Sequence, residues 1–304
     1  MLAYREKNNL IHQLHPVTSL TLVGVAFFLS LVFSHPVYLL GLLLAMGVII
    51  WAAGIFQEWK VYLKFSISMM VIIIVINSLF SRNGTTVLFA GTEIPLLGQF
   101  KITLEAIAYG GGMGLKLLVI ISIFCFYTYG IHPDKPLKLL SRWGNKSVLV
   151  IILTTRLFPL MTQDFKRISE VQQCRGVQLK TGKWVKRVQN YIPIFSVLLV
   201  SSLERALKLA ESMHTRGFGS GPQSWYYRDL WRPRDYLIIV ALTLSLVWGL
   251  WTVLKGWSSY AYYPRLTPLH PAEIRGAGTV SIGLLVPALL SWGWEKWPKL
   301  KSKI

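Results

Sequence analysis

The chain is organised around the stretch from Arg156 to Gly219, which contains two related segments. Residues 156–176 read RLFPLMTQDFKRISEVQQCRG, and residues 202–218 read SLERALKLAESMHTRGF. Each segment has the apolar spacing of an amphipathic helix, and each leads to an Arg-Gly pair. Both lie in the long polar region of a chain that is otherwise apolar. The sequence therefore predicts a membrane platform carrying two polar helices that contact a soluble partner.

Apolar residues recur at helical spacing in both segments. From Asp164 onward they form a narrow stripe in which every third residue is apolar: Phe165, Ile168, Val171 and Cys174. In the second segment they follow the pattern of a helix laid on an apolar surface: Leu203, Ala206, Leu207, Ala210, Met213 and then Phe218. Each segment therefore predicts a helix with one apolar face and one charged face.

The two predicted helices stop at Gly176 and Gly217. Glycine adopts the left-handed conformation of the residue after a helix at little steric cost. Arg175 and Arg216 then occupy the last turn, where the helix dipole and the free carbonyls favour a cation. The planar guanidinium of each arginine suits carboxylates or backbone carbonyls on a partner surface.

An Arg-Gly pair by itself is weak support for a site, because it is a common helix ending. A third pair, Arg275-Gly276, lies in a proline-rich stretch that we expect to be an external loop with no amphipathic helix before it. The other two pairs recur 41 residues apart, each after an amphipathic helix. This recurrence makes them the candidates for a functional site.

The composition indicates a membrane protein. Hydrophobic residues make up 53% of the 304 residues and charged residues 15%, whereas a soluble domain carries about 25% charged residues. The formal net charge of +19 would also suit a nucleic-acid-binding protein, but basic cytoplasmic loops explain it better. We therefore expect no nucleic-acid partner.

Six apolar runs are each close to the roughly 20 residues that cross a bilayer. They are Val17–Phe33, Val37–Phe56, Val61–Phe80, Thr103–Tyr129, Tyr236–Leu254 and Gly278–Trp294. Residues 81–99 have the glycine and proline content of a loop with room for a small hairpin. Two shorter apolar pieces, 147–155 and 191–201, are predicted to dip into the membrane or pack against it and to lead into the amphipathic helices. The predicted fold is therefore an all-α polytopic membrane protein with about six spanning helices and two long amphipathic coupling helices.

The fourth run has an unusual start. Residues 110–114 read GGGMG, and Lys116 follows them. Small residues allow helices to approach closely in lipid, and a lysine within a span is costly unless it pairs or snorkels. We favour a close-packed helix with a snorkelling lysine over a ligand site.

Charge divides the chain into three parts, 1–131, 132–236 and 237–304. The middle part holds 18 of the 32 Lys and Arg residues, which indicates a cytoplasmic region. With four spans before it and two after it, both termini are also predicted to be cytoplasmic. The loops then predicted to lie outside hold few basic residues, as the positive-inside rule requires.

Five pieces of sequence stand in order along the chain: LHPVTSL at 14–20, RLFPL at 156–160, QCRG at 173–176, ESMHTRGF at 211–218 and WRPRD at 231–235. In this order they resemble motifs of the transmembrane T component, EcfT or CbiQ-like, of energy-coupling factor transporters, and they cover nearly the whole chain. His15 stands where that family usually has Asp. Cys174 and Thr215 stand where it has Ala before each Arg-Gly. Small residues still precede each arginine, so close docking stays compatible with the sequence.

The resemblance implies a subunit without catalytic activity in the cell membrane of a prokaryote. Two cytoplasmic ATPase subunits would bind the ATP and receive the two helices in their grooves, so no cofactor is expected on this chain. A membrane-embedded S component would bind the substrate, a vitamin or a transition-metal ion. The resemblance assigns ATPase coupling to Arg175, Gly176, Arg216 and Gly217. Supporting positions on the helices are Arg156, Pro159, Cys174, Met213, Thr215 and Phe218.

Two other functions stay open from the residues alone. A conventional ABC permease would bind the substrate itself, but it normally has one coupling motif rather than two in tandem. A membrane-embedded enzyme needs clustered acids, whereas Asp164, Glu170, Glu204 and Glu211 are spread over the polar helices. The sequence has no Walker A motif and no HExxH, and its six histidines are scattered. We therefore expect neither a nucleotide site nor a metal site on this chain.

Overall fold

The structure is a computed structural model that describes residues 9–80, 84–94, 98–132, 135–136, 139, 145–177, 184–221, 231–264, 267–268 and 270–296. Contacts within the chain divide it into two units. The membrane unit comprises residues 2–136 and 229–304, and the coupling unit comprises residues 137–228.

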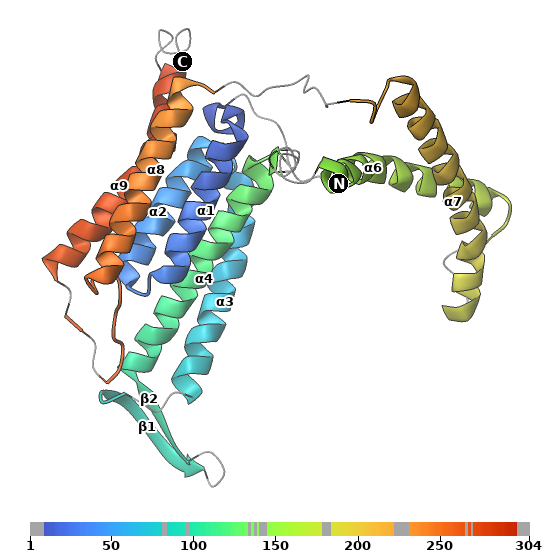
Figure 1. The fold of residues 1–304 in the computed structure, drawn as a ribbon. Helices are drawn as coiled ribbons and strands as arrows, with labels where there is room; N and C mark the ends of the chain where they lie inside the picture. The colour runs from blue at the N-terminus through green and yellow to red at the C-terminus, as the bar shows by residue number, and fades with distance from the viewer. Residues whose placement is uncertain are drawn as a thin grey trace. The chain divides into compact units, whose positions relative to one another are not determined.

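The membrane unit is built from apolar helices (Figure 1). Four are long and apolar enough to cross a membrane: α3 (Phe56–Phe80), α4 (Leu104–Gly130), α8 (Pro233–Leu254) and α9 (Pro271–Lys296). A short 3-10 turn, η1 (Leu10–Gln13), precedes two shorter apolar helices, α1 (Pro16–Val32) and α2 (Pro36–Ala52). The prediction of about six spanning helices is confirmed.

A small hairpin connects α3 to α4. Strands β1 (Val87–Ile94) and β2 (Gly98–Thr103) pair in antiparallel fashion, with Val87 opposite Thr103 and Ile94 opposite Gly98. The predicted loop therefore contains the hairpin for which it had room. The all-α class is confirmed for the membrane-crossing part of the chain.

Small residues bring the helices of the membrane unit into close contact. A Cβ atom on Gly41 of α2 would overlap Ser281 of α9, and one on Gly283 of α9 would overlap Ser245 of α8. A Cβ on Gly110 of α4 would lie 2.8 Å from the Cα of Ile74 on α3. Such close contacts favour the association of helices in lipid, because an apolar side chain gains little free energy when it moves from lipid into a helix interface. The interpretation of the glycine stretch as a close-packed helix is confirmed.

Lys116 of α4 has a backbone partner. Its Nζ donates a hydrogen bond of 2.6 Å to the carbonyl of Leu31, which lies in the last turn of α1. The last carbonyls of a helix have no partner within that helix. The lysine therefore donates to a carbonyl at the end of α1 that has no partner within that helix.

The coupling unit contains α6 (Asn145–Cys174) and α7 (Trp184–Thr215). Both helices begin well before the predicted amphipathic segments, which start at Arg156 and Ser202. The short apolar pieces 147–155 and 191–201 form part of each helix and continue directly into its polar half. The side chains change from apolar to polar in the middle of each helix. The hydrogen-bonded backbone continues, because propagating a helix is easier than starting one.

Each of these helices also contains an internal proline, Pro159 in α6 and Pro193 in α7. Proline removes one helical hydrogen bond and usually ends or kinks a helix. In both helices a hydroxyl three residues later donates to the proline carbonyl, from Thr162 at 2.7 Å and from Ser196 at 2.9 Å. Pro159, which the resemblance named as a supporting position of the first coupling helix, therefore lies inside that helix.

The third Arg-Gly pair does not lie in a loop. Arg275 and Gly276 belong to the second turn of α9, which begins at Pro271. The Oε2 atom of Glu273 accepts a 2.9 Å hydrogen bond from the backbone N–H of His270, as the acidic residue of a capping box does. His-Pro at the start of the helix was the missed signal, since α1 and α2 also begin directly after a histidine, at Pro16 and Pro36.

Candidate coupling surface

The two helices of the coupling unit cross each other (Figure 1), and aromatic rings from both helices lie at the contact. The ring of Phe165 on α6 has its centroid 6.3 Å from that of Tyr191 and 6.1 Å from that of Phe195, both on α7. Ile194 is fully buried and Ser169 is 8% exposed. These residues mark the crossing of α6 and α7 and fix which faces of the helices stay outward.

An ion pair also joins the two helices. A guanidinium nitrogen of Arg205 on α7 lies 2.6 Å from Oδ2 of Asp164 on α6, and about one third of each side chain is exposed. Asp164 precedes Arg175 by eleven residues, and Arg205 precedes Arg216 by eleven residues. The ion pair therefore connects equivalent positions of the two related segments, which the sequence alone did not indicate.

The first helix ends in a Schellman motif. The N–H of Gly176 donates to the carbonyl of Gln173 at 2.9 Å, and the N–H of Val177 donates to that of Gln172 at 3.1 Å. Gly176 has a φ of +86°, and no other group lies within 4 Å of the position of a Cβ. Glycine is therefore needed for its backbone conformation, as predicted, and not for lack of space.

The second helix ends in the same way. The N–H of Gly217 donates to the carbonyl of His214 at 2.9 Å, and the N–H of Phe218 donates to that of Met213 at 3.0 Å. Gly217 has a φ of +73°. Arg175 and Arg216 therefore occupy the same C-cap position of the same motif, and the prediction of two glycine-terminated helices is confirmed.

The same motif ends α2 and α8 in the described part of the membrane unit. There the cap residues are Ala53 and Lys255, followed by Gly54 and Gly256 with positive φ. An arginine is thus not required by the cap geometry, because alanine fills the same position in α2. The glycine-terminated ending is thus shared by several helices of the chain, whereas the arginine at the cap needs another explanation.

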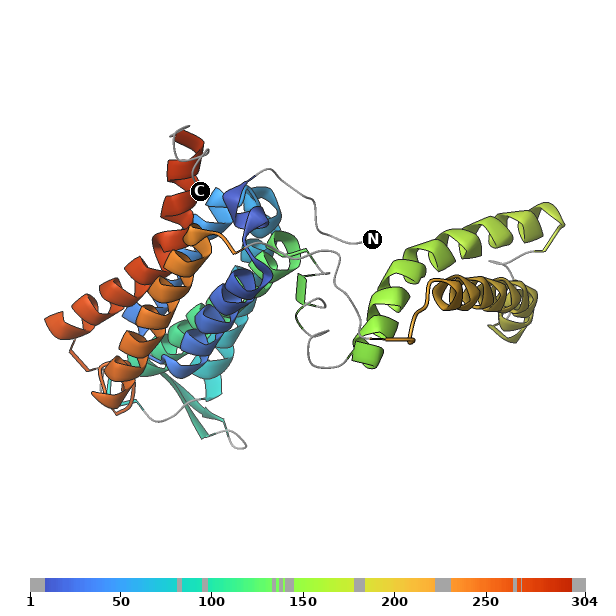
Figure 2. The same cartoon turned by 45° about the horizontal axis from the view of Figure 1, so that its top comes forward.

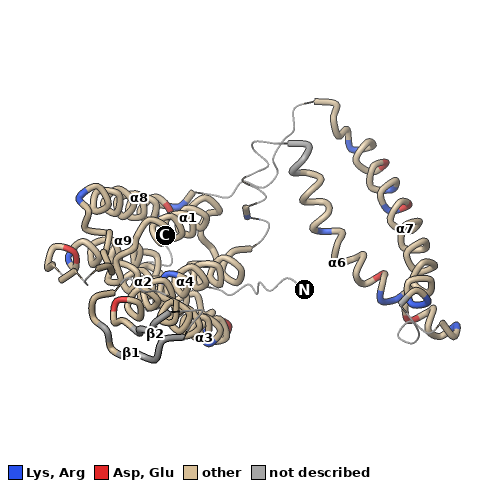
Figure 3. The backbone as a smooth tube through the Cα atoms, turned by 90° about the horizontal axis from the view of Figure 1, so that it is seen from below, with Lys and Arg blue, Asp and Glu red and all other residues tan. Residues whose placement is uncertain are grey.

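Both cap arginines are exposed. Within the described residues neither guanidinium has a hydrogen-bond or ion-pair partner. Figure 3 shows that basic and acidic residues recur along α7 and the second half of α6. Two unpaired cations at the ends of related helices form a surface suited to a partner that carries acceptors.

The supporting positions lie on the same two helices. Arg156, Pro159, Cys174, Thr215 and Phe218 are exposed, and Met213 is half-buried. The apolar stripe of α7 is also open to the surroundings, since Leu199, Leu203 and Leu207 are 61%, 56% and 64% exposed. The structure assembles these positions into two exposed helix surfaces rather than into an enclosed pocket.

The first and last of the five motif pieces meet in the membrane unit, although they are about 220 residues apart. The backbone N–H of His15 donates to Oδ1 of Asp235 at 3.1 Å. The rings of His15 and Trp231 stack with centroids 4.1 Å apart. Oδ2 of Asp235 accepts from the N–H of Arg232 at 3.2 Å. Asp235 therefore holds the start of α1 against the start of α8, a pairing that the spacing of the motifs did not reveal.

Further hydrogen bonds gather the helix ends at this end of the membrane unit. Lys135, just after α4, donates through Nζ to the carbonyls of His12 and Leu14, both at 2.8 Å. Asn9 donates to the carbonyl of Ala52 at the end of α2 at 3.1 Å. The chain before α1, the end of α2, the end of α4 and the start of α8 therefore share one end of the membrane unit.

Two comparisons with known proteins bear on this arrangement. The profile of the family CbiQ, described as a cobalt transport protein, matches residues 7–227. The chain belongs to this family. The matched range includes the coupling unit with both Arg-Gly helices and the first four helices of the membrane unit.

Several curated relatives carry the name energy-coupling factor transporter transmembrane protein EcfT. The chain is 33% identical to the relative from Streptococcus thermophilus over 190 residues, which cover 59% of this chain and 71% of the relative. It is 26% identical to that from Lactococcus lactis over 257 residues, 80% of this chain and 94% of the relative. It is 26% identical to the relative from Bacillus subtilis over 253 residues, which cover 79% of this chain and 92% of the relative. The chain is thus a transmembrane component of an energy-coupling factor transporter, and it is not a catalytic enzyme.

The structure explains one departure from the EcfT and CbiQ pattern. His15 stands where the family has Asp, and its Nδ1 accepts a 3.3 Å hydrogen bond from the N–H of Val17. This is the capping role that Asp ordinarily plays at the start of a helix. The imidazole thus provides the acceptor at this cap without placing a second carboxylate beside Asp235.

Metal binding has no candidate in the described residues, where no group of three or more His, Cys, Asp or Glu side chains is placed to hold an ion. The two cysteines are separate, Cys125 buried in α4 and Cys174 exposed at the end of α6. In the described residues the candidate site therefore consists of the ends of α6 and α7.

Proposed function

We propose that this chain transmits ATP-driven motion of two cytoplasmic ATPase subunits to a membrane-embedded S component that binds a vitamin or a transition-metal ion. The observation that carries the proposal is the matched pair of exposed arginine caps at the ends of α6 and α7. Each helix would engage one ATPase subunit, and the ATPases would bind the ATP. When ATP draws the two ATPases together, each would move one helix and so shift the helices that hold the S component.

The chemistry of the cap favours an arginine contact with acceptors on the ATPases. A C-cap arginine projects from the helix end, and its planar fork can bind a carboxylate or two carbonyls at once. The small residues before each arginine, Cys174 and Thr215, leave room for a close approach. Gly176 and Gly217 turn the chain away directly afterwards, so that the helix end itself can enter a groove.

The orientation in the membrane follows from charge and from the shared end of the membrane unit. The chain leaves for the coupling unit after α4 and returns at α8, at the same end as the segment before α1. If the basic coupling unit is cytoplasmic, as the positive-inside rule favours, that end is cytoplasmic too. Both termini then face the cytoplasm of a prokaryotic cell.

Replacing both arginines tests the proposal. In cells that also produce the ATPases and the S component, Arg175→Ala with Arg216→Ala should abolish co-purification of the ATPases and uptake of substrate. Truncating one partner of a buried charged contact costs about 2–5 kcal/mol of binding, so each loss should weaken the complex about thirtyfold or more.

Lys255→Ala is the matched control, because Lys255 occupies the same cap position in α8. Alanine at position 53 shows that the cap tolerates this side chain, so both variants should fold. Normal uptake by the double arginine variant would contradict the proposed coupling.

A further inference from the structure

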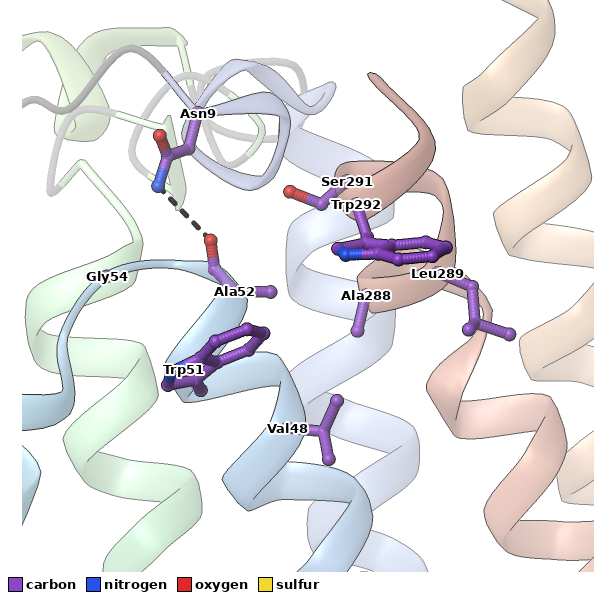
Figure 4. A pocket seen from close by; sticks show the side chains of 9 residues that line it. All are labelled: Asn9, Val48, Trp51, Ala52, Gly54, Ala288, Leu289, Ser291 and Trp292. Atoms are coloured by element: carbon purple, nitrogen blue, oxygen red, sulfur yellow. Dashed lines mark hydrogen bonds between the residues drawn. The ribbon is translucent and has the colours of Figure 1, made fainter. Parts of the chain in front are cut away.

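The membrane unit has a cleft between the ends of α2 and α9 (Figure 4). It encloses about 500 Å³, and the described residues that line it, among them Asn9, Trp51 and Trp292, carry no charge. An uncharged lining of this kind does not distinguish one apolar molecule from another. Charged side chains with a recurring pattern lie instead on the two coupling helices.

The coupling helices share a second charged residue besides the cap arginine. When α6 and α7 are aligned on their cap arginines, residues 164–176 read DFKRISEVQQCRG and residues 205–217 read RALKLAESMHTRG. Three of the thirteen aligned positions are identical: the cap arginine, the glycine after it and a glutamate five residues before the arginine. This glutamate is Glu170 in α6 and Glu211 in α7. The carboxylate thus recurs with the arginine, although the four residues between them differ at every position.

The stability of the helices alone does not account for the two glutamates. Both are exposed, and neither forms an ion pair or a hydrogen bond with another described residue. A basic residue stands three positions earlier in each helix, Arg167 and Lys208, at the spacing of an intrahelical ion pair. The described helices do not form this pair. Toward the negative end of a helix the dipole favours cations and gives no advantage to an acid.

Each glutamate lies on the outer side of its helix. The two helices lie side by side (Figure 2), and the residues two positions before and after each glutamate are half-buried: Ile168 and Gln172 in α6, Leu209 and Met213 in α7. Two residues correspond to about 200° around a helix, so the carboxylate lies on the side opposite to this half-buried stripe. It is therefore accessible to a partner from outside the coupling unit.

The glutamate and the cap arginine lie on different sides of the helix end. The N–H of Arg175 still donates to the carbonyl of Val171 at 3.2 Å, so helical geometry extends to the cap. Five residues of helix place the two charges about 140° apart around the axis and about 7.5 Å apart along it. A flat surface meets only one side of a helix, whereas the two walls of a groove meet opposite sides. The two charges therefore suit a groove.

We propose that Glu170 and Glu211 are a second contact of each coupling helix, made with a groove that has two unlike walls. One wall offers carboxylates or carbonyls to the cap arginine, and the other offers a lysine or an arginine to the glutamate. The proposal rests on the proposed function, because the groove belongs to the ATPase subunit that receives each helix. Opposite charges on two sides fix the rotation of the helix about its own axis, which the arginine contact alone leaves free.

Changing the charge of the glutamates tests the proposal in the complete transporter. In cells that also produce the ATPases and the S component, Glu170→Gln with Glu211→Gln should weaken the binding of the ATPases about tenfold or more, as for the loss of a hydrogen bond to a charged group. Glu170→Lys with Glu211→Lys should abolish their co-purification, because like charges then meet in the groove. The unfolding temperature of the purified glutamine variant should equal that of the native chain.

Glu204→Gln is the matched control. It removes another exposed acid of α7, but α6 has Gln163 at the aligned position, so this variant should bind the ATPases as the native chain does. An equal loss in this control, or a lower unfolding temperature in the glutamine variant, would overturn the proposal.

The arginine variant separates this proposal from the proposed function. If the glutamine and lysine variants bind the ATPases normally while Arg175→Ala with Arg216→Ala loses them, the second contact is wrong and the proposed function stands. If the arginine variant also keeps the ATPases and transports substrate, both are wrong.

Discussion

The membrane unit and the coupling unit are both helical, but they bury their side chains to different degrees. In the membrane unit Leu22, Leu42 and Met46 are fully buried, and small residues bring the helices together. In the coupling unit the buried side chains lie at one crossing, with Ile194 at its centre. A region with few buried apolar contacts opens more easily than a packed core. The described part of the membrane unit therefore has a core of its own, whereas the described helices of the coupling unit leave most of their surface exposed.

The largest difference in stability is expected when one leucine is truncated in each unit. Leu42→Ala removes a fully buried side chain and should lower the free energy of unfolding by about 2–5 kcal/mol. Leu203→Ala removes a side chain that is 56% exposed and should change it by only about 0.5 kcal/mol. Thermal unfolding of the purified chain in detergent measures both. Equal losses would mean that the coupling unit has a core of its own.

A second pair of changes tests how closely the helices of the membrane unit pack. Gly110→Ala places a Cβ 2.8 Å from the backbone of Ile74, and such overpacking should cost about 1–3 kcal/mol. Gly111→Ala, at the next residue, meets nothing within 4 Å and should be neutral or stabilising by up to about 1 kcal/mol. The unfolding temperatures of the two variants measure this difference in stability. Similar destabilisation of both would show that close contact with α3 is not the cause.

The third prediction concerns pH. His35 is 1% exposed, its Nε2 lies 3.2 Å from Oε2 of Glu273, and its Nδ1 accepts from the N–H of Val37. Burial lowers the pKa of His35 below its ordinary value, and Glu273 only partly offsets this effect. The unfolded chain therefore takes up a proton at a higher pH than the folded chain. Stability should be complete above about pH 6.5 and should fall as the pH drops through the lowered pKa.

His35→Asn keeps an acceptor at the cap without a group that titrates near neutral pH. Between pH 7 and pH 5 the free energy of unfolding of the native chain should fall by about 1 kcal/mol, as for a lost helix cap. In the His35→Asn variant this fall should become smaller. His214→Asn in the coupling unit changes an exposed histidine and should leave the pH profile as it is. Unfolding curves at several pH values measure the three profiles, and an unchanged profile in the His35 variant would rule out this histidine as the cause.

The smallest effect is expected at the crossing of α6 and α7. Asp164→Ala or Arg205→Ala breaks an ion pair that is about one third exposed, so the coupling energy should be only about 0.2–1 kcal/mol. A double-mutant cycle measured by unfolding isolates this term. Exchanging the two residues, Asp164→Arg with Arg205→Asp, should restore part of the loss. A coupling energy of zero would leave the aromatic contacts as the sole support of the crossing.

The sequence predicted what local pattern controls and missed what distant contacts control. Apolar runs gave the membrane helices, and glycine after arginine gave the ends of α6 and α7, because both depend on neighbours along the chain. Arg275 was misplaced because the prolines around it were read as a loop, whereas α9 begins at Pro271, before the arginine. The hydrogen bond from His15 to Asp235 joins residues 220 positions apart, and periodicity carries no information about such a pair.

The ion pair between Asp164 and Arg205 also sets a distance on each helix. Eleven residues separate each member of the pair from the cap arginine of its own helix. At about 1.5 Å per residue this is roughly 16 Å on both sides. The ion pair is thus equally far from Arg175 along α6 and from Arg216 along α7, so a rotation of the helices about the ion pair would displace the two arginines by similar amounts.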